Sequence, residues 1–197
     1  ETFEIIKQLC PEEIEKTRIL EIGSGSGDIT KGLVEIADEI VCVDYSKKMI
    51  EEAKSRIDSD KIEYHCLKVE ELENVGEFDL IVAAECIHWM EWKTIFPKLK
   101  NFLKPEGKLL LIYRDYVSLP EINSIVSIIQ RYSTNDEWED YDIKKCLENR
   151  GFFTNVNEKQ TEPIILQQSI NGFIESIHSR NGFSKERMKP ENIKIFL

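Results

Sequence analysis

Three glycines near the start of the chain have the spacing of a ligand-binding loop. Gly23, Gly25 and Gly27 stand at alternate positions, directly after the short apolar run 18–22. Glycine lets the backbone turn sharply and come close to a ligand, because it has no Cβ to clash. In an open α/β sheet, the loop after the first strand lies at the edge where ligands bind. The spacing therefore predicts a loop that holds a small ligand.

The same loop lacks the patterns of phosphate-binding loops. A dinucleotide fingerprint G-x-G-x-x-G needs its third glycine at position 28 or 30, where Asp28 and Thr30 stand. Asp28 also places a negative charge where a helix N-terminus would meet a pyrophosphate. No Gly-Lys-Ser/Thr follows, which excludes a P-loop. We therefore expect an adenosyl ligand without phosphates, and a nicotinamide-dependent oxidoreductase is disfavoured.

A carboxylate follows the loop at the distance expected for ribose recognition. Asp44 ends the second apolar run, seventeen residues after Gly27. A carboxylate at such a strand tip can accept hydrogen bonds from both ribose hydroxyls. The alternative is that Asp44 only caps the next helix. With the glycine loop before it, we favour the ribose role.

These residues need a sheet to bring them together, and the hydrophobic pattern predicts one. The expected strands are 18–22, 39–43, 62–67, 78–84 and 108–113. Between them, helical spacing covers 29–37, 92–103 and a segment capped by Ser46. The chain should stop its helix at 104–107, before the fifth strand. Alternating strands and helices predict an α/β fold with a doubly wound, mostly parallel Rossmann-like sheet and helices on both faces.

The pattern changes after residue 115. Helices are expected over 119–132, 142–150 and 170–178, with Gly151 as the left-handed cap of the second. Two further strands, 154–158 and 164–168, are expected to form an antiparallel C-terminal edge hairpin. No fold is assigned to 184–197. We expect one domain over 1–197, with a cofactor-binding half at 1–115 and sheet completion with possible acceptor-site elements at 116–197.

The composition limits the classes of binding partner and the compartment that we expect for this chain. The chain has 26 Lys and Arg against 37 Asp and Glu, a formal charge of −11, which opposes broad binding to nucleic-acid backbones. The five cysteines are scattered and form no Cys-x-x-Cys pair, so neither a disulfide framework nor a metal site is expected. No apolar run reaches the ~20 residues of a membrane span, and no signal peptide is visible. These features predict a cytoplasmic protein without a membrane segment.

Four stretches in order resemble the class I S-adenosylmethionine-dependent methyltransferases. Glu21 to Gly27 looks like their E/D-x-G-x-G-x-G motif, and Asp44 matches their acidic residue after strand two. Residues 78–84, FDLIVAA, are similar to their strand-four motif, and 102–110, FLKPEGKLL, to their strand-five entry. The resemblance covers roughly residues 15 to 115. It implies S-adenosylmethionine as cofactor, S-adenosylhomocysteine as product, and methyl transfer as the activity.

The resemblance also implies a set of cofactor-binding residues. Lys68 stands where many members have an Asp that meets the adenine amino group, so Val69, through its backbone, and Glu70 are expected to substitute. The full expected set is Glu21, Gly23, Ser24, Gly25, Gly27, Asp44, Tyr45, Met49, Val69, Glu70 and Ala84.

The acceptor side is expected just after the fourth strand. His88 is the candidate catalytic base, since a hydroxyl or amine acceptor must lose a proton near neutral pH; the alternative is a pocket-lining residue. The expected acceptor pocket holds Glu85, His88, Trp89 and Tyr113, and Trp92 is either a pocket wall or part of the core. Residues 86–89, CIHW, are similar to the A-L-H-W stretch of the small-molecule branch that includes trans-aconitate methyltransferases.

The acceptor class follows from what is missing. The fourth strand is not followed by the Asn/Asp-Pro-Pro-Tyr of amino-methylating nucleic-acid and glutamine enzymes, and no Pro-Cys pair supplies a cytosine nucleophile. A small-molecule acceptor, methylated on oxygen or nitrogen, is therefore the leading hypothesis. The alternatives are a non-catalytic module that binds S-adenosylmethionine or S-adenosylhomocysteine and, less favoured, a nucleic-acid or protein methyltransferase. A synthase that uses decarboxylated S-adenosylmethionine would need more acidic residues after the fourth strand.

Overall fold

The computed structural model describes residues 1–10, 16–114, 122–132, 143–151, 153, 157–178 and 188–196. The chain divides into two compact units. The first is Glu1–Asp115 with Arg150–Asn155, and the second is Tyr116–Asn149 with Val156–Leu197.

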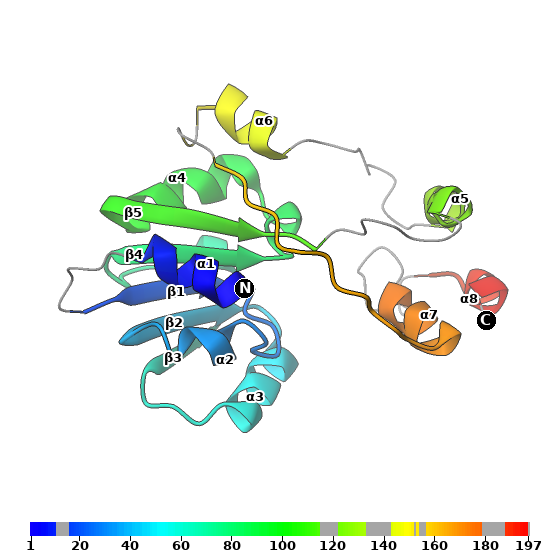
Figure 1. Ribbon diagram of the computed structural model, residues 1–197, viewed down its shortest axis with the longest axis horizontal. Coiled ribbons are helices and arrows are strands. Elements are labelled where there is room, and N and C mark those ends of the chain that lie inside the picture. Colours follow the sequence, from blue (N-terminus) through cyan, green and yellow to red (C-terminus); the bar gives the residue numbers. More distant parts are fainter. Residues whose placement is uncertain are drawn as a thin grey trace. The chain divides into compact units, whose positions relative to one another are not determined.

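The first unit is built on a parallel sheet, whose five strands are labelled in Figure 1. Its strands are β1 (Arg18–Ile22), β2 (Glu39–Asp44), β3 (Ile62–Cys66), β4 (Phe78–Ala84) and β5 (Leu103–Ile112). They lie in the order β3-β2-β1-β4-β5, and every neighbouring pair is parallel. β1, β2 and β4 are buried almost throughout, because both faces of the sheet are covered. The predicted parallel sheet is confirmed, and its topological switch point lies between β1 and β4.

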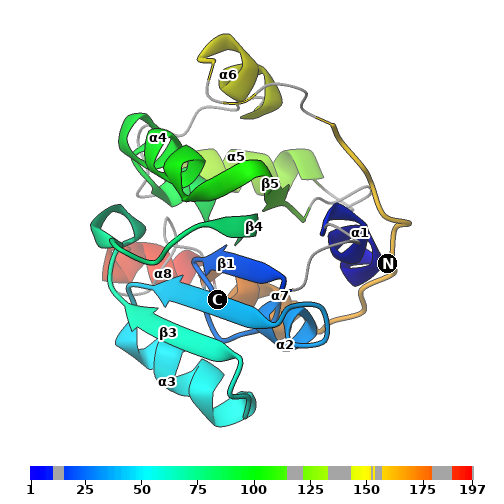
Figure 2. The same cartoon turned by 90° about the vertical axis from the view of Figure 1, so that its left-hand side faces the viewer.

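Helices cover both faces of this sheet. They are α1 (Thr2–Leu9), α2 (Thr30–Leu33), α3 (Lys47–Arg56) and α4 (Trp92–Phe102), with 3-10 turns η1 (Val69–Glu71) and η2 (Ile87–Trp89). Figure 2 shows α1 and α2 on one face and α3 and α4 on the other. Ile6 and Leu33 pack on Ile19 and Leu80 in a fully buried cluster on the first of these faces. The layers therefore agree with the doubly wound prediction.

In the first unit, two element boundaries differ from the sequence prediction by more than one residue. α2 ends at Leu33, and residues 34–36 form turns, although apolar spacing suggested a helix to position 37. β5 begins at Leu103, directly after α4, and takes in the stretch 104–107 that was expected to stand between them. A register shift absorbs the extra residues, since Phe78 pairs with Leu103 and Leu80 with Lys108. The predicted cap of α3 is confirmed, because Ser46 Oγ accepts the Met49 N–H at 3.4 Å.

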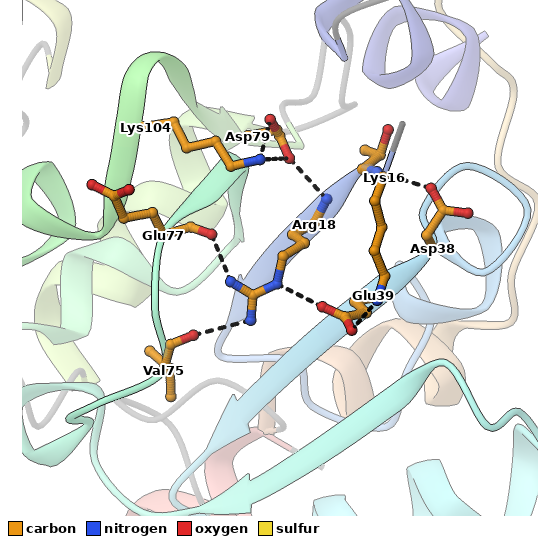
Figure 3. A network of polar contacts seen from close by, with 9 residues as sticks. Lys16, Arg18, Asp38, Glu39, Val75, Glu77, Asp79 and Lys104 are labelled. Atoms are coloured by element: carbon orange, nitrogen blue, oxygen red, sulfur yellow. Dashed lines mark hydrogen bonds and ion pairs between the residues drawn. The ribbon is translucent and has the colours of Figure 1, made fainter. Parts of the chain in front are cut away.

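The amino-terminal edge of the sheet is held by a network of ion pairs and hydrogen bonds (Figure 3). Arg18 Nε donates to Glu39 Oε2 at 2.6 Å, and its terminal nitrogens donate to the carbonyls of Glu77 and Val75 at 2.7 and 3.1 Å. One guanidinium therefore ties β1 to β2 and to the approach to β4. Because it is planar and carries five donors, arginine suits such a multiple contact.

Asp79, from the FDL stretch of β4, anchors the other half of this network. Its buried carboxylate accepts the backbone N–H of Arg18 at 2.9 Å, and both its oxygens accept from Lys104 Nζ at 2.8 Å. These contacts join the starts of β1, β4 and β5 (Figure 3). The polar groups at this edge satisfy one another, which leaves the opposite edge as the place for a ligand.

The second unit contains helices only, as far as the structure describes it. They are α5 (Ile122–Tyr132), α6 (Ile143–Asn149), α7 (Ile170–His178) and α8 (Pro190–Phe196). Ile177 and Met188 form a small buried cluster with Phe173, Ile193 and Tyr132 packed against it. α6 is followed by Gly151 at φ +67, the left-handed residue predicted there. α8 lies in the region to which the sequence assigned no structure.

The predicted strand 164–168 is wrong. Residues 157–169 form no strand, and Ile164 and Ile165 are 87 % and 92 % exposed. An isoleucine-rich run favours strand locally, but a strand also needs a partner for its backbone hydrogen bonds. Positions 154–156 of the other expected strand lie outside the described residues. In the described part of the chain, the sheet therefore ends at β5, without the edge hairpin.

Within the described residues, no helix combines the length and apolar character that crossing a bilayer requires. Nor do these residues gather three or more His, Cys, Asp or Glu side chains in a group suited to hold a metal ion.

Candidate functional site

The glycine loop leaves β1 at the switch point and packs closely on the end of β4. Gly23 has φ +63, and a Cβ added there would lie 2.6 Å from Cβ of Cys86. Gly25 has φ +55, but a Cβ added there would meet no described atom within 4 Å. Gly23 is thus required for packing within the protein, whereas the space in front of Gly25 is open. A ligand can approach the backbone at Gly25.

Asp44 fixes this loop to the neighbouring strand. Its Oδ2 accepts the Gly25 N–H at 2.9 Å and its Oδ1 accepts the Ser46 N–H at 2.8 Å. The bond from Ser46 lies in the turn before α3, whose N-cap is Ser46 itself, so Asp44 does not cap the helix. The bond from Gly25 gives Asp44 a structural role in the loop. Each carboxylate oxygen accepts one bond here and has capacity for another. Recognition of a ribose by Asp44 stays a prediction.

Ser24, the residue before Gly25 in the loop, has an unsatisfied polar atom. Its side chain is buried, and its Oγ has no hydrogen-bond partner among the described residues. A buried hydroxyl without a partner is unusual and calls for an explanation. A polar ligand group in front of the loop would supply the missing bond. Together with the open space at Gly25, this fits the adenosyl cofactor expected from sequence.

Glu21, which was expected at the ligand-binding surface, has a buried side chain. Glu21 is 2 % exposed and lies on the sheet face covered by α1 and α2, where Thr30 Oγ1 donates to its Oε2 at 2.6 Å. Burial raises the pKa of this carboxyl to about 7, and the hydrogen bonds from Thr30 and Cys42 oppose the rise. The Glu21 carboxylate bonds to Thr30 and Cys42, and its direct contact with the cofactor stays a prediction.

Glu21 should make the stability of the protein depend on pH. Its pKa is about 7 in the folded state and 4.5 ordinarily, so between these values the folded chain holds a proton that the unfolded chain loses. The free energy of unfolding should therefore fall by about 3 kcal/mol as pH rises from 4.5 through 7. Glu21→Gln, which cannot ionise, should lack this fall. Urea unfolding of both proteins at several pH values tests this, and parallel pH curves would contradict it.

Some of the remaining predicted cofactor residues are exposed to solvent, and others are buried or already hydrogen-bonded. Tyr45 and Met49 follow β2 and are 78 % and 38 % exposed, so both can contact a ligand. Val69 is buried, which agrees with a backbone role. Glu70 Oε1 accepts the Glu91 N–H at 3.4 Å, so its carboxylate is turned toward the start of α4. Ala84 ends β4 beside Ile112.

The expected acceptor residues follow the adjacent ends of β4 and β5. Glu85, His88 and Trp89 come after β4, and Tyr113 comes after β5; Trp89 and Tyr113 are 51 % and 43 % exposed. The rings of His88 and Trp89 are 4.4 Å apart between centroids. Desolvation by the surrounding residues lowers the pKa of His88 below its ordinary 6.5, against the opposing charge of Glu85. The imidazole is therefore mainly neutral at pH 7 and able to accept a proton.

The structure bears on one open assignment and adds two residues that the sequence analysis did not name. Trp92 is half-buried and packs against the core, since its Nε1 donates to the Ile87 carbonyl at 2.9 Å and its ring packs edge-on against Phe96. Arg56, at the end of α3, donates to Ser26 O and Asp28 Oδ1 at 2.8 and 2.7 Å and so holds the glycine loop. Arg114 donates its N–H to Glu85 Oε1 at 2.6 Å. No motif marks either arginine, because both contacts join residues about thirty positions apart.

A family model and several known proteins are similar to this part of the chain. Residues 20–111 match the model described as "Methyltransferase domain". A malonyl-[acyl-carrier protein] O-methyltransferase from Priestia megaterium is 35 % identical over 112 residues, which cover 55 % of this chain and 41 % of that protein. A ubiquinone biosynthesis O-methyltransferase from Bradyrhizobium diazoefficiens is 30 % identical over 97 residues, which cover 48 % of this chain and 38 % of that protein.

Solved structures share the fold. The N-methyltransferase NodS from Bradyrhizobium japonicum matches with a TM-score of 0.51 at 22 % identity, over 68 % of this chain and 81 % of that chain. The YcgJ protein of Bacillus subtilis matches with a TM-score of 0.52 at 20 % identity, over 66 % and 56 %. The chain spans about half or less of the length of the curated relatives it matches.

Residues 20–111 are therefore similar to methyltransferase domains, and they span the whole five-stranded parallel sheet apart from the ends of β1 and β5. The more specific relation to trans-aconitate methyltransferases stays a prediction.

Proposed function

Proceeding from the similarity of residues 20–111 to methyltransferase domains, we propose that this chain transfers the methyl group of S-adenosylmethionine to a small-molecule acceptor. One observation carries the proposal. In the described part of the first unit, four of the large apolar side chains left exposed follow the carboxyl ends of strands; they are Tyr45, Met49, Trp89 and Tyr113. Exposed apolar side chains at the ligand-binding edge of such a sheet indicate a binding site for an organic molecule rather than a surface that only contacts water.

The residues at this edge divide the work of binding. Asp44 is placed to accept ribose hydroxyls, and Ser24 Oγ to take the hydrogen bond it lacks. Tyr45 and Met49 offer apolar surface on the β2 side of the switch point. Aromatic faces also attract a sulfonium, by roughly 0.5–2 kcal/mol. Trp89 and Tyr113 would therefore stabilise the positively charged sulfur of the cofactor as well as contact the acceptor. When bound, the cofactor supplies a methyl carbon on a positively charged sulfur, which is a good leaving group.

Alignment is then the main contribution of the protein. Methyl transfer by in-line displacement needs the acceptor atom held close to the methyl carbon, with water kept out. The adjacent ends of β4 and β5 carry the residues that would hold the acceptor. His88, neutral at pH 7, would take the proton of a hydroxyl or amine acceptor. A carboxylate acceptor needs no base.

The acceptor that we favour is methylated on oxygen. Two of the relatives are named as O-methyltransferases, one for malonyl-[acyl-carrier protein] and one in ubiquinone biosynthesis. The formal charge of −11 and the absence of an Asn/Asp-Pro-Pro-Tyr stretch weigh against nucleic acid. Small carboxylates, their thioesters and phenols are therefore the first acceptors to test, with trans-aconitate among the carboxylates.

A non-catalytic cofactor-binding module is a poorer match. Such a module would close its acceptor pocket with the segment after β4. Cys86 and Ile87 are buried there, but His88 and Trp89 are exposed, with Trp89 at 51 %. The exposed His88 and Trp89 are available to contact an acceptor, which supports the catalytic proposal.

A methyl-transfer assay with His88→Ala tests both the activity and the base. The purified chain should transfer labelled methyl from S-adenosylmethionine to at least one acceptor of these classes. With a hydroxyl acceptor, His88→Ala should lower turnover roughly 10²- to 10⁴-fold. Wild-type turnover should fall as pH drops through the His88 pKa, which lies below 6.5.

The acceptor classes act as controls for each other. With a carboxylate acceptor, His88→Ala should change turnover little, because no proton is removed. Affinity for S-adenosylmethionine should be unchanged in the variant. Full turnover of a hydroxyl acceptor by His88→Ala would show that His88 only lines the pocket, and transfer to none of the tested acceptors would count against the proposed function.

A further inference from the structure

The backbone at the end of β4 adopts a conformation that its residue type disfavours. Glu85 has φ +53, in the left-handed region, where a Cβ carries a steric cost. Among described non-glycine residues, only Asn74 shares this feature, at φ +57. Asparagine tolerates that region because its short side chain bonds locally, whereas glutamate has no such advantage. Strain at the ligand-binding edge therefore points to a role for the Glu85 side chain.

Glu85 holds both peptide groups that flank Tyr113. Its N–H donates to the Ile112 carbonyl at 2.9 Å, and its Oε1 accepts the Arg114 N–H at 2.6 Å. These two bonds extend the connection between β4 and β5 beyond the last register pair, Ala84 with Ile112. The second bond uses a carboxylate, and a charged acceptor makes a stronger bond than a neutral one. Tyr113 is thereby fixed on both sides.

From this geometry we infer that Glu85 is a positioning residue: it clamps the peptide groups on either side of Tyr113 and so sets the β5 side of the acceptor site. The inference rests on the proposed function, since Tyr113 is assigned to the acceptor pocket. The sequence expectation that Glu85 contacts the acceptor directly stays a prediction, and the bond from Arg114 to Oε1 gives Glu85 a second role.

The carboxylate also acts on His88. Its negative charge raises the pKa of the imidazole, while desolvation by the surrounding residues lowers it. Glu85→Gln keeps an oxygen that can accept from Arg114 but removes this charge. Glu85→Gly removes both the oxygen and the charge, and it relieves the strain at φ +53. The two variants therefore separate the clamp from the charge.

Amide hydrogen exchange and His88 titration, both followed by NMR on the full chain, test the inference without an acceptor. In Glu85→Gly, protection of the Arg114 amide should fall at least tenfold. In Glu85→Gln, the Arg114 amide should stay protected, and the His88 titration should move to lower pH. Glu85→Asn, which tolerates the left-handed region but is shorter, serves as a second clamp-deficient variant if Glu85→Gly does not fold.

Asn74→Gly is the matched control. It relieves a positive φ of nearly the same value, in the loop that precedes β4 at the opposite edge of the sheet. It should leave both the Arg114 amide and the His88 titration as in the wild type. Any change at these two positions in the Glu85 variants then comes from the Glu85 side chain and not from relief of strain.

Activity adds a readout that separates this inference from the proposed function. If methyl transfer is detected, Glu85→Gly should raise KM for the acceptor about tenfold while Kd for S-adenosylmethionine stays unchanged. If transfer is not detected, the NMR results still decide whether the clamp exists. Unchanged Arg114 protection in both clamp-deficient variants, an unmoved His88 titration in Glu85→Gln, or an equal loss of cofactor affinity in Glu85→Gly would overturn the inference.

Discussion

Replacing Gly25 with valine is expected to reduce the affinity for S-adenosylmethionine at least 1000-fold, a loss of about 4 kcal/mol. The space in front of Gly25 is open within the protein, so the valine side chain would occupy it and exclude a ligand. The expected loss is large because the backbone at this point has to come into direct contact with the cofactor. Calorimetric titration of the variant measures the loss.

Gly151 provides a matched control for the strain. It has φ +67, near the +55 of Gly25, and a Cβ added there also meets no described atom within 4 Å. Gly25→Val and Gly151→Val should therefore lose similar stability, of the order of the 1–2 kcal/mol that left-handed backbone costs a residue with a Cβ. Only Gly25→Val should lose binding. Wild-type affinity in Gly25→Val would remove the glycine loop from the cofactor site.

Replacing Asp79 with alanine is expected to destabilise the protein by about 3 kcal/mol. The change leaves the ammonium group of Lys104 and the N–H of Arg18 without the carboxylate they share. Breaking a buried pair from one side typically costs 3–5 kcal/mol, and the Lys104 side chain is 31 % exposed, so the lower end applies. Urea unfolding of the variant measures the change.

Lys16→Ala is the control from the same network. Lys16 pairs with Glu39, but their side chains are 56 % and 41 % exposed, and such surface pairs contribute about 0–1 kcal/mol. Both variants remove one ion pair from the same edge of the sheet (Figure 3). If burial decides the cost, Asp79→Ala should be much the less stable of the two. Equal losses would show that Asp79 is not the anchor of this edge.

Local patterns were enough to predict the sheet. Each strand of a parallel sheet needs a nearly continuous apolar run, and β1, β2 and β4 have one, so their positions could be read without knowledge of their partners. The glycine loop and Asp44 were found in the same way, from spacing alone. The structure adds the bond between them, from the Gly25 N–H to Asp44.

Long-range pairing could not be predicted from local patterns. Glu21 is buried where Thr30 and Cys42 donate hydrogen bonds to its Oε2, and Glu70 is turned toward Glu91. The Arg56 and Arg114 contacts join segments that are distant in sequence. The isoleucine-rich run at 164–168 was predicted as a strand from its local propensity, but it forms no strand because a strand also needs a pairing partner.

The central claim is that the first unit binds S-adenosylmethionine at the switch point between β1 and β4. Calorimetric titration of the purified chain with S-adenosylmethionine, S-adenosylhomocysteine and NAD tests this claim directly. We expect the first two to bind with micromolar Kd and NAD not to bind, because the loop lacks the third glycine and carries Asp28. Binding of NAD in place of S-adenosylmethionine, or a folded chain that binds neither S-adenosylmethionine nor S-adenosylhomocysteine, would contradict it.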